Sequence, residues 1–398
     1  MFSQRVDGLR PSPIRAILNV IDRPGMVSFA GGLPANDPLP YWEGSVPPAT
    51  LQYGPTEGDA DLRAAISANL TDLGIDAPPE RVMILSGSQQ GIDLAAKLFI
   101  DRGTPVAVEH PTYLAALQVL RFYGAEFTDI ASLATDPGRS PRMHPGTTPR
   151  GAGGTLANQA RLAYLVPTFA NPTGACATEA ERDTIALNCL RNRTVLFEDD
   201  PYRELTYDPC DRTPITSRMT DGPWIYQGSF SKTFAPGLRL GFLAASEDLF
   251  TQLAIVKQAT DLHSSRLSQH IVYQAITSPA WPEQLGRLAD FYRSSRDAFE
   301  DALCSNIGDL TTWHKPTGGL FYWLRLRDPL DTRDLLTTAI DRNVAFMPGE
   351  DFYPGQPELG TMRLNFSHAD AADTDRGLHT LAQILRDWRH TISACTAR

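Results

Sequence analysis

The feature that most constrains the fold is an alternation of short apolar runs with helix-like patterns between residues 81 and 245. The runs are rich in Val, Ile, Leu and aromatic side chains, which is typical of strands buried on both faces. They are RVMIL (81–85), PVAVEH (105–110), LAYLVP (162–167), TVLFED (194–199), WIYQGS (224–229) and LRLGFLAA (238–245). Apolar residues then recur at helical spacing at Ile92, Ala95, Ala96 and Phe99. Strands that alternate with helices predict an α/β fold with a mostly parallel sheet covered by helices.

From about Pro282 the pattern changes to that of a smaller α+β domain. A long helix is followed by LFYWLRL, a helix over 331–342, VAFMP, TMRLNFS and a closing helix near 370–388. We expect an N-terminal arm over 1–45 at the start of the chain. A large domain over 46–280 and a small domain over 281–398 would follow it.

The composition limits the classes of partner. The 398 residues carry 36 Lys+Arg against 46 Asp+Glu, a net charge of −10, which argues against a nucleic acid or an anionic membrane as partner. No run of about 18 apolar residues predicts a membrane-spanning helix. The N-terminus lacks a continuous apolar segment because Arg15 interrupts it. We expect a soluble, cytoplasmic protein.

The cysteines and histidines do not indicate a metal site. The five cysteines are scattered and never in CxxC spacing, which is unlike a disulfide framework or a thiolate cluster. His263 and His270 are seven residues apart with no third ligand nearby. We expect no metal.

Polar side chains follow several of the predicted strands. Ser88 stands where a strand gives way to a helix, so it could be a plain N-cap or could open a phosphate site at the helix start. Asp199 and Asp200 follow another strand with Tyr202 close behind, and a buried carboxylate there would need a cationic partner. Asn171 follows a third strand, where a simple turn is the alternative reading.

The segment SFSKTFAPGLRLG (229–241) adds a lysine to this set. Lys232 has hydroxyl-bearing neighbours and is followed by Arg239, which suggests that an anion is held there. A phosphate site, a buried acid, an amide, a phenol and a lysine after strands of one sheet fit a cofactor with a phosphate, a protonatable ring nitrogen, a phenolic oxygen and an aldehyde. Pyridoxal 5′-phosphate has those four groups.

With these residues, the chain resembles a class I/II, fold-type-I aminotransferase, nearest to the 2-aminoadipate/kynurenine aminotransferase group. The resemblance runs from about Pro11 to the C-terminus. It implies that the large sheet has seven strands and that the N-terminal arm over 1–45 contributes to the small domain and the active site. It is carried by PSPIR (11–15), SFAGGLP (28–34), QYGPTEG (52–58), SGSQQ (86–90), PTY (111–113), NPTG (171–174), DDPY (199–202), SFSKTFAPGLRLG (229–241) and MRLNFS (362–367).

The resemblance implies a role for each matching residue. Lys232 would form the aldimine with the cofactor, Asp199 would pair with the pyridine nitrogen, and Tyr113 would stack on the ring. Asn171 and Tyr202 would bind the phenolic oxygen, and Arg363 would bind the substrate's α-carboxylate. The residues that would hold the phosphate are Ser88, Gln89, Ser229, Ser231 and Arg239.

Three further roles are implied at the edge of the site. Tyr53 matches a residue that reaches the active site of the neighbouring subunit, which implies a homodimer, although a core tyrosine is the alternative. Gly32 matches a glycine that lies against the substrate. Arg15 matches an arginine that meets a side-chain carboxylate, and a solvated surface arginine is the alternative.

Two features depart from the family pattern. His110 precedes PTY where relatives generally carry an acid, and we expect it to pack rather than to tune the site. The stretch 134–155 is rich in Pro, Gly, Ser and Thr, and is predicted to be a mobile loop. Neither departure touches the residues that would hold the cofactor.

The expected function is transfer of an amino group from an L-amino acid, of 2-aminoadipate, aromatic or other large-side-chain type, to a 2-oxo acid such as 2-oxoglutarate. The alternative is a pyridoxal-phosphate enzyme of secondary metabolism that acts on an unusual amino acid as a transaminase, lyase or oxidase. A more distant alternative is a regulatory module that senses the cofactor. Against it, the resemblance begins near residue 11, ahead of which we expect no DNA-binding domain.

Overall fold

The computed structural model describes residues 3–6, 23–35, 42, 44–134 and 160–396. Its largest feature is a seven-stranded sheet in the order β2–β8–β7–β6–β5–β3–β4. Neighbouring strands are parallel except for β8, which is antiparallel to both β2 and β7. The predicted mostly parallel seven-stranded sheet is thus confirmed. The strands are β2 (Val82–Leu85), β3 (Pro105–Val108), β4 (Glu126–Asp129), β5 (Leu162–Leu165), β6 (Val195–Asp199), β7 (Trp224–Ser229) and β8 (Gly241–Ala245).

Each of the six apolar runs contains one strand of this sheet. The edge strand β4 was not among them because EFTD alternates polar with apolar residues, and none of its four residues is fully buried. Alternation along β2 sends Met83 and Leu85 into one hydrophobic core and Val82 and Ile84 into another, as expected for a sheet covered on both faces.

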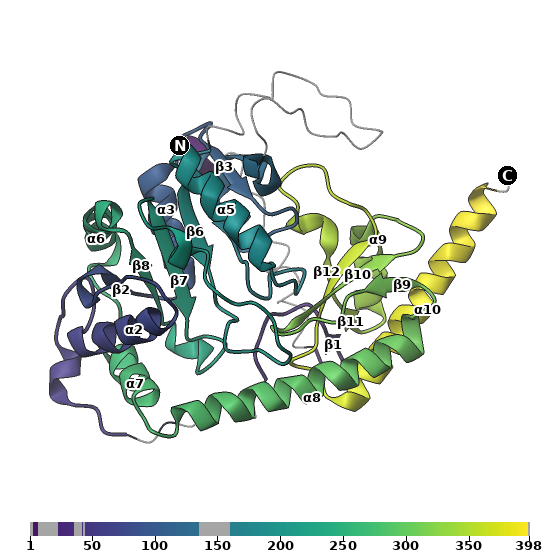
Figure 1. Ribbon diagram of the computed structural model, residues 1–398. Coiled ribbons are helices and arrows are strands. Elements are labelled where there is room, and N and C mark those ends of the chain that lie inside the picture. Colours follow the sequence, from purple (N-terminus) through teal and green to yellow (C-terminus); the bar gives the residue numbers. More distant parts are fainter. Residues whose placement is uncertain (1–2, 7–22, 36–41, 43, 135–159, 397–398) are drawn as a thin grey trace.

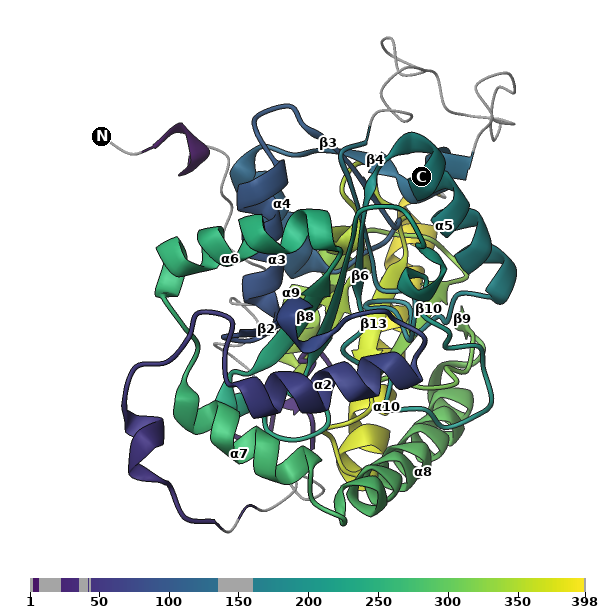
Figure 2. The same cartoon turned by 60° about the vertical axis from the view of Figure 1, so that its left-hand side comes forward.

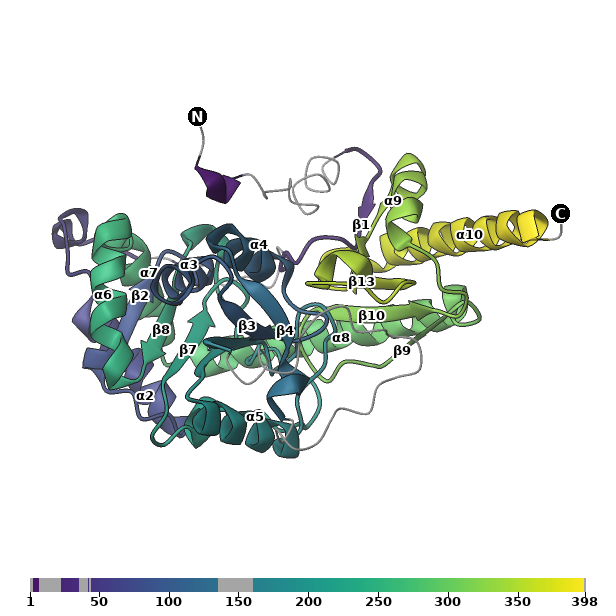
Figure 3. The same ribbon diagram turned by 90° about the horizontal axis from the view of Figure 1, so that it is seen from above.

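Helices cover both faces of the sheet. Figure 3 shows α3 and α4 on one side and α5 on the other. The α5 helix starts with a capping box between Thr178 and Glu181, and α4 ends at Gly124, whose φ of 96° suits a glycine. The helices of this part are α2 (Ala60–Asp72), α3 (Ser88–Phe99), α4 (Leu114–Tyr123), α5 (Glu179–Asn192), α6 (Glu247–Asp261) and α7 (Arg266–Ile276).

A smaller part follows, with a four-stranded antiparallel sheet in the order β12–β13–β10–β9. The long helix α8 runs from the large part along the small one, where α10 packs against it (Figure 1). The elements are β9 (Thr311–Trp313), β10 (Phe321–Leu326), β11 (Val344–Ala345), β12 (Met347–Pro348), β13 (Thr361–Asn365), α8 (Trp281–Ile307), α9 (Thr332–Asp341) and α10 (Ala371–Thr396).

The N-terminal strand β1 (Val27–Ser28) pairs in parallel with β11, so this segment belongs with the small part. The exact domain boundaries stay a prediction. Short 3₁₀ helices complete the described elements: η1 (Gln4–Val6), η2 (Pro48–Leu51), η3 (Pro79–Arg81), η4 (Ile130–Ala134), η6 (Thr216–Arg218), η7 (Pro236–Leu238) and η8 (Gly349–Phe352).

Two sequence predictions fall at the margins of this description. The loop predicted over 134–155 lies outside the described residues from position 135 onward. Within the described ranges, no helix is both long enough and apolar enough to span a bilayer.

Candidate active site

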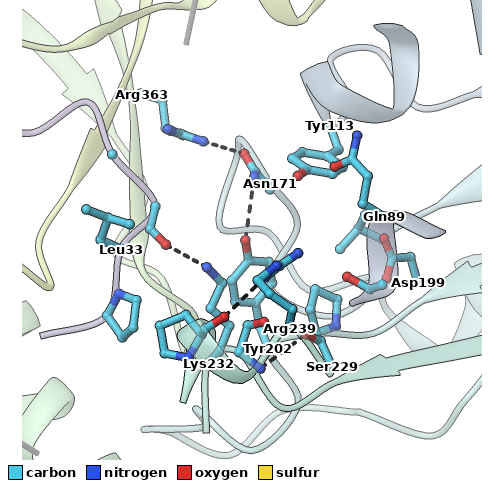
Figure 4. Close-up of a pocket in the computed structure, with 18 of the residues that line it drawn as sticks. Leu33, Gln89, Tyr113, Asn171, Asp199, Tyr202, Ser229, Lys232, Arg239 and Arg363 are labelled. Carbon is cyan, nitrogen blue, oxygen red and sulfur yellow. Dashed lines mark hydrogen bonds between the residues drawn. The ribbon is translucent and has the colours of Figure 1, made fainter. Parts of the chain in front are cut away.

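A cavity of about 290 Å³ lies where the carboxyl ends of the large sheet face the small part. Ligands of open α/β sheets bind at this edge. Every predicted site residue that the structure describes lines the cavity, with Tyr53 as the exception. Figure 4 shows that the side chains come from both parts of the molecule, with Arg363 from β13 across from Lys232 and Asp199 of the large sheet.

One end of the cavity is a recess at the start of α3. No side chain caps this helix, so its first backbone N–H groups are free to meet an anion. The recess is tight: a Cβ on Gly87 would lie 2.5 Å from Nη2 of Arg239, and one on Gly241 would lie 3.0 Å from the backbone nitrogen of Ser88. The guanidinium of Arg239 donates to the carbonyl oxygen of Pro236 at 3.3 Å. This recess suits a phosphate group.

Asp199 is the acid of the cavity. Its carboxylate accepts hydrogen bonds from the Tyr164 hydroxyl at 2.8 Å and from Nε2 of Gln227 at 2.9 Å. Burial raises the pKa of Asp199 to about 6, against the two donors, which favour the ionised form. Among the described residues no cation lies within ion-pair distance of this carboxylate. Asp199 is therefore available to a cationic group of a ligand.

Lys232 is the amine of the cavity. Its Nζ donates to the carbonyl oxygen of Gly32 at 2.6 Å. Burial, together with the positive charges of Arg363 and Arg239, lowers the pKa of Lys232 to about 8. A substantial share of this amine is consequently neutral near physiological pH, which a nucleophile or a base requires.

Arg363 supplies a planar cation from the small part. It donates to Oδ1 of Asn171 at 2.7 Å and to the carbonyl oxygen of Ala30 at 2.6 Å. Its guanidinium carbon also lies 4.2 Å from the ring centroid of Phe321. Burial lowers the pKa of Arg363 to about 10, so this group stays charged at neutral pH.

Aromatic and amide groups complete the cavity. Tyr113 immediately precedes α4, and Nδ2 of Asn171 is 3.5 Å from the Tyr202 hydroxyl, a long hydrogen bond. The backbone N–H of Ser231 donates to Oγ of Ser229 at 3.2 Å, which keeps both serines at the end of β7.

Tyr53 and His110 do not line the cavity, and Arg15 is not placed. Tyr53 is 77% exposed and packs edge-on against His263, with 5.7 Å between ring centroids. Arg15 lies outside the described residues. His110 does not line the cavity; its Nδ1 is 3.9 Å from a carboxylate oxygen of Asp129 on β4.

Sequence reasoning missed the residues that hold Asp199. Tyr164 and Gln227 sit inside strands β5 and β7, where a tyrosine is an ordinary strand residue and a single glutamine carries no functional pattern. Their only signal is position, since both flank Asp199 on the neighbouring strands.

Comparison with known proteins gives a consistent result. A family model described as aminotransferase class I and II matches residues 46–381. An aromatic-amino-acid aminotransferase of Thermococcus litoralis is 33% identical, with 97% of this chain and 94% of the relative covered. A 2-aminoadipate transaminase of Thermus thermophilus is 32% identical, with 97% and 96% covered.

Solved structures agree. The alpha-aminoadipate aminotransferase of Thermus thermophilus, complexed with N-(5′-phosphopyridoxyl)-L-leucine, superposes with a TM-score of 0.80 at 31% identity. The kynurenine aminotransferase of Pyrococcus horikoshii does so with a TM-score of 0.85 at 30% identity. Each alignment covers 97% of both chains.

Proposed function

The chain belongs to the class I and II aminotransferases, and on that premise we propose that the cavity is the active site of this pyridoxal-phosphate-dependent enzyme. The activity is transfer of an amino group from an amino acid to a 2-oxo acid, so the predicted family, cofactor and reaction class are confirmed. The roles of individual residues, the acceptor and the assembly are our proposals.

The observation that carries the assignment is the set of separated charges in one cavity. Asp199, Lys232, Arg239 and Arg363 all line it, yet each is held by neutral partners. With Lys232 protonated, three cations face one acid, an excess that suits a ligand carrying phosphate and carboxylate groups.

We assign the recess at the start of α3 to the cofactor phosphate. The N–H groups of α3 and the guanidinium of Arg239 would bind it, because a helix start and a planar cation both favour a phosphate. The surrounding hydroxyl and amide groups would add further hydrogen bonds: Ser88, Gln89, Ser229 and Ser231.

The rest of the cofactor would lie between Tyr113 and the end of the sheet. Asp199 would pair with the ring nitrogen and favour its protonated form. Asn171 and Tyr202 would donate to the phenolic oxygen, and Tyr113 would cover the ring face.

Arg363 would bind the α-carboxylate of the substrate. Its planar pair of donors matches a carboxylate better than a lysine would. The Asn171 and Ala30 oxygens that it now contacts keep the guanidinium oriented, so little side-chain entropy is lost on binding. Gly32 lines the same cavity and would lie against the substrate.

When bound, the cofactor supplies an aldehyde that captures the amino group and a ring that withdraws electrons from the substrate's Cα. The chain must supply the base. In its neutral form, Lys232 Nζ would take the proton from the substrate's Cα and hold it for the later return step. Asp199 would hold the balancing negative charge throughout.

We further propose 2-oxoglutarate as acceptor and a donor with a large side chain. In a homodimer, Tyr53 would reach the partner's cavity, and its 77% exposure in the single chain supports this. A second carboxylate on the substrate would need a further cation, because Lys232, Arg239 and Arg363 already have roles. We assign that part to Arg15.

A lyase or oxidase is the competing chemistry, since the same residues would stabilise any carbanion at Cα. The discriminating experiment follows the visible absorption of the purified holoenzyme under anaerobic conditions while L-amino acids are added one at a time. A transaminase bleaches the cofactor band with its donor and recovers it with 2-oxoglutarate. Turnover that appears only with oxygen, or release of ammonia without an acceptor, would replace the transaminase assignment.

A further inference from the structure

A network of polar side chains lies directly behind the recess and centres on Lys257 of α6. This helix lies beside α3 (Figure 2). The Lys257 side chain is fully buried, and its Nζ has three acceptors, which uses all three N–H groups of an ammonium. The acceptors are Gln90 Oε1 at 3.1 Å, Asp261 Oδ1 at 2.9 Å and Ser264 Oγ at 3.2 Å.

The partners of Lys257 hold the turn that opens α3. Gln90 Oε1 also accepts from the backbone N–H of Ser86 at 2.8 Å. Asp261 Oδ2 accepts from the Ser86 hydroxyl at 3.0 Å and from Gln90 Nε2 at 2.6 Å. Ser264 Oγ donates to the carbonyl oxygen of Ile84 at 3.2 Å. The network therefore hydrogen-bonds to the chain on both sides of Gly87 and Ser88: to Ile84 and Ser86 before them and to Gln90 after them.

The position of this turn decides the geometry of the recess. Gly87 leaves no room for a Cβ beside Arg239, and a Cβ on Gly241 would also come unusually close to the Ser88 nitrogen, although less so. A shift of the turn by a fraction of an ångström would change how the free N–H groups of α3 and the guanidinium converge. Lys257 itself does not line the cavity, so any effect on a ligand must pass through its partners Gln90, Asp261 and Ser264.

We propose that Lys257 is a positioning residue for the cofactor phosphate, because it fixes the 86–90 turn against Arg239. This inference rests on the proposed function, since it takes the start of α3 as the phosphate site. The proposal concerns only the phosphate. It therefore predicts a selective loss of affinity for the phosphorylated cofactor, which a general loss of stability would not produce.

The positive charge of Lys257 explains why a lysine occupies this position. Burial lowers the pKa of Lys257, and the contact with Asp261 opposes that shift. The Asp261 side chain is 27% exposed, so the pair is only partly desolvated. Loss of the ammonium would leave the Asp261 carboxylate and Gln90 Oε1 without their shared donor, so that only the bonds to Ser86 and the Gln90–Asp261 bond would remain. The turn would then be held less firmly.

The test compares cofactors with and without the phosphate. Apoenzyme of the wild type and of Lys257→Met is titrated with pyridoxal 5′-phosphate and with pyridoxal, and the dissociation constants are measured from the absorption of the lysine-linked cofactor. We expect Lys257→Met to weaken pyridoxal-phosphate binding by about tenfold, which corresponds to one hydrogen bond to a charged group. Pyridoxal binding should change by less than about twofold, since its contacts are elsewhere. The ³¹P resonance of the bound cofactor should also shift.

A matched control is Arg296→Met. Arg296 is likewise a buried cation paired with carboxylates, those of Asp208 and Asp297, but it lies in α8 and contacts no residue of the recess. It should lower stability without separating the two cofactors.

Equal losses for both cofactors in Lys257→Met, or no loss for either, would overturn the proposal. If the single variant does not fold, Lys257→Met combined with Asp261→Asn removes both charges and carries the same comparison. A wild type that binds both cofactors equally well would instead refute the phosphate site, and with it the proposed function.

Discussion

At the end of β6, the buried acid on one side of the sheet forms an ion pair within the protein, whereas the buried acid on the cavity side has only neutral partners. On the face away from the cavity, Asp200 and Arg203 form a buried ion pair at 2.6 Å, and the Tyr226 hydroxyl donates to the same carboxylate oxygen at 2.9 Å. On the cavity face, Asp199 has only the neutral donors Tyr164 and Gln227.

Asp199, the last residue of β6, and Asp200, the residue after it, thus differ in what remains for a ligand. Successive side chains point to opposite faces, so one residue of separation is enough to place Asp199 and Asp200 in different surroundings. The pair on the far face is neutralised within the protein, whereas the charges of the cavity are kept apart. The separation leaves each cavity charge able to bind an opposite charge on the cofactor or substrate.

Loss of the amine should have the largest effect on the cavity face. Lys232→Ala should lower kcat by about 10⁴-fold, since it removes both the covalent attachment and the base. In the wild type, capture of pyridoxal phosphate by apoenzyme should speed up as pH rises and level off above about 8, because only the neutral amine attacks. Stopped-flow absorbance measures both. An unchanged cofactor band in Lys232→Ala would place the attachment on another lysine.

Neutralising the cavity acid should come next. Asp199→Asn should lower kcat by about 10³-fold, because the carboxylate no longer stabilises the protonated ring nitrogen. Steady-state rates with a good donor test this, with circular dichroism as the control for folding. A kcat within a few-fold of the wild-type value would contradict the proposed pairing of Asp199 with the cofactor ring.

The same change on the far face should act on stability instead. Asp200→Asn leaves the Arg203 guanidinium buried without its carboxylate and should lower the free energy of unfolding by about 3 kcal/mol. Urea denaturation measures the loss, while the cofactor spectrum should keep its wild-type position. If Asp200→Asn altered the spectrum as strongly as Asp199→Asn, the distinction between the two faces would fail.

The smallest effect should follow from exchanging one cation for another. Arg363→Lys keeps the charge but loses the planar pair of donors, so KM for the amino acid should rise roughly tenfold to a hundredfold. Binding of pyridoxal phosphate should be nearly unchanged. A matching loss of cofactor affinity would mean that Arg363 serves the cofactor rather than the substrate.

The sequence predicted the fold well wherever burial leaves an apolar run. All six runs became strands of the large sheet, and the motifs at their ends came together in one cavity. The edge strand β4 was not predicted because none of its four side chains is fully buried. Its alternating residues do not form the continuous apolar run of a buried strand.

The supporting residues could not be predicted for a different reason. Lys257 lies in a helix where a lysine normally extends its charge into solvent, and its partner Gln90 is 167 residues away in the chain. Nothing in either local pattern marks the contact. Tyr164 and Gln227 are similar cases, since their function depends on which strands are neighbours.

The antiparallel strand β8 has a consequence for how the enzyme is made. Because β8 pairs with both β2 and β7, it brings Arg239 beside Gly87, although these residues are far apart in the chain. A ribosome that adds about 5–20 residues per second needs roughly 8–30 s to cover that interval. During this time the emerging chain has the start of α3 but no guanidinium beside it. Binding of the cofactor through this recess must therefore follow synthesis of β8. The cofactor consequently cannot guide the earlier steps of folding.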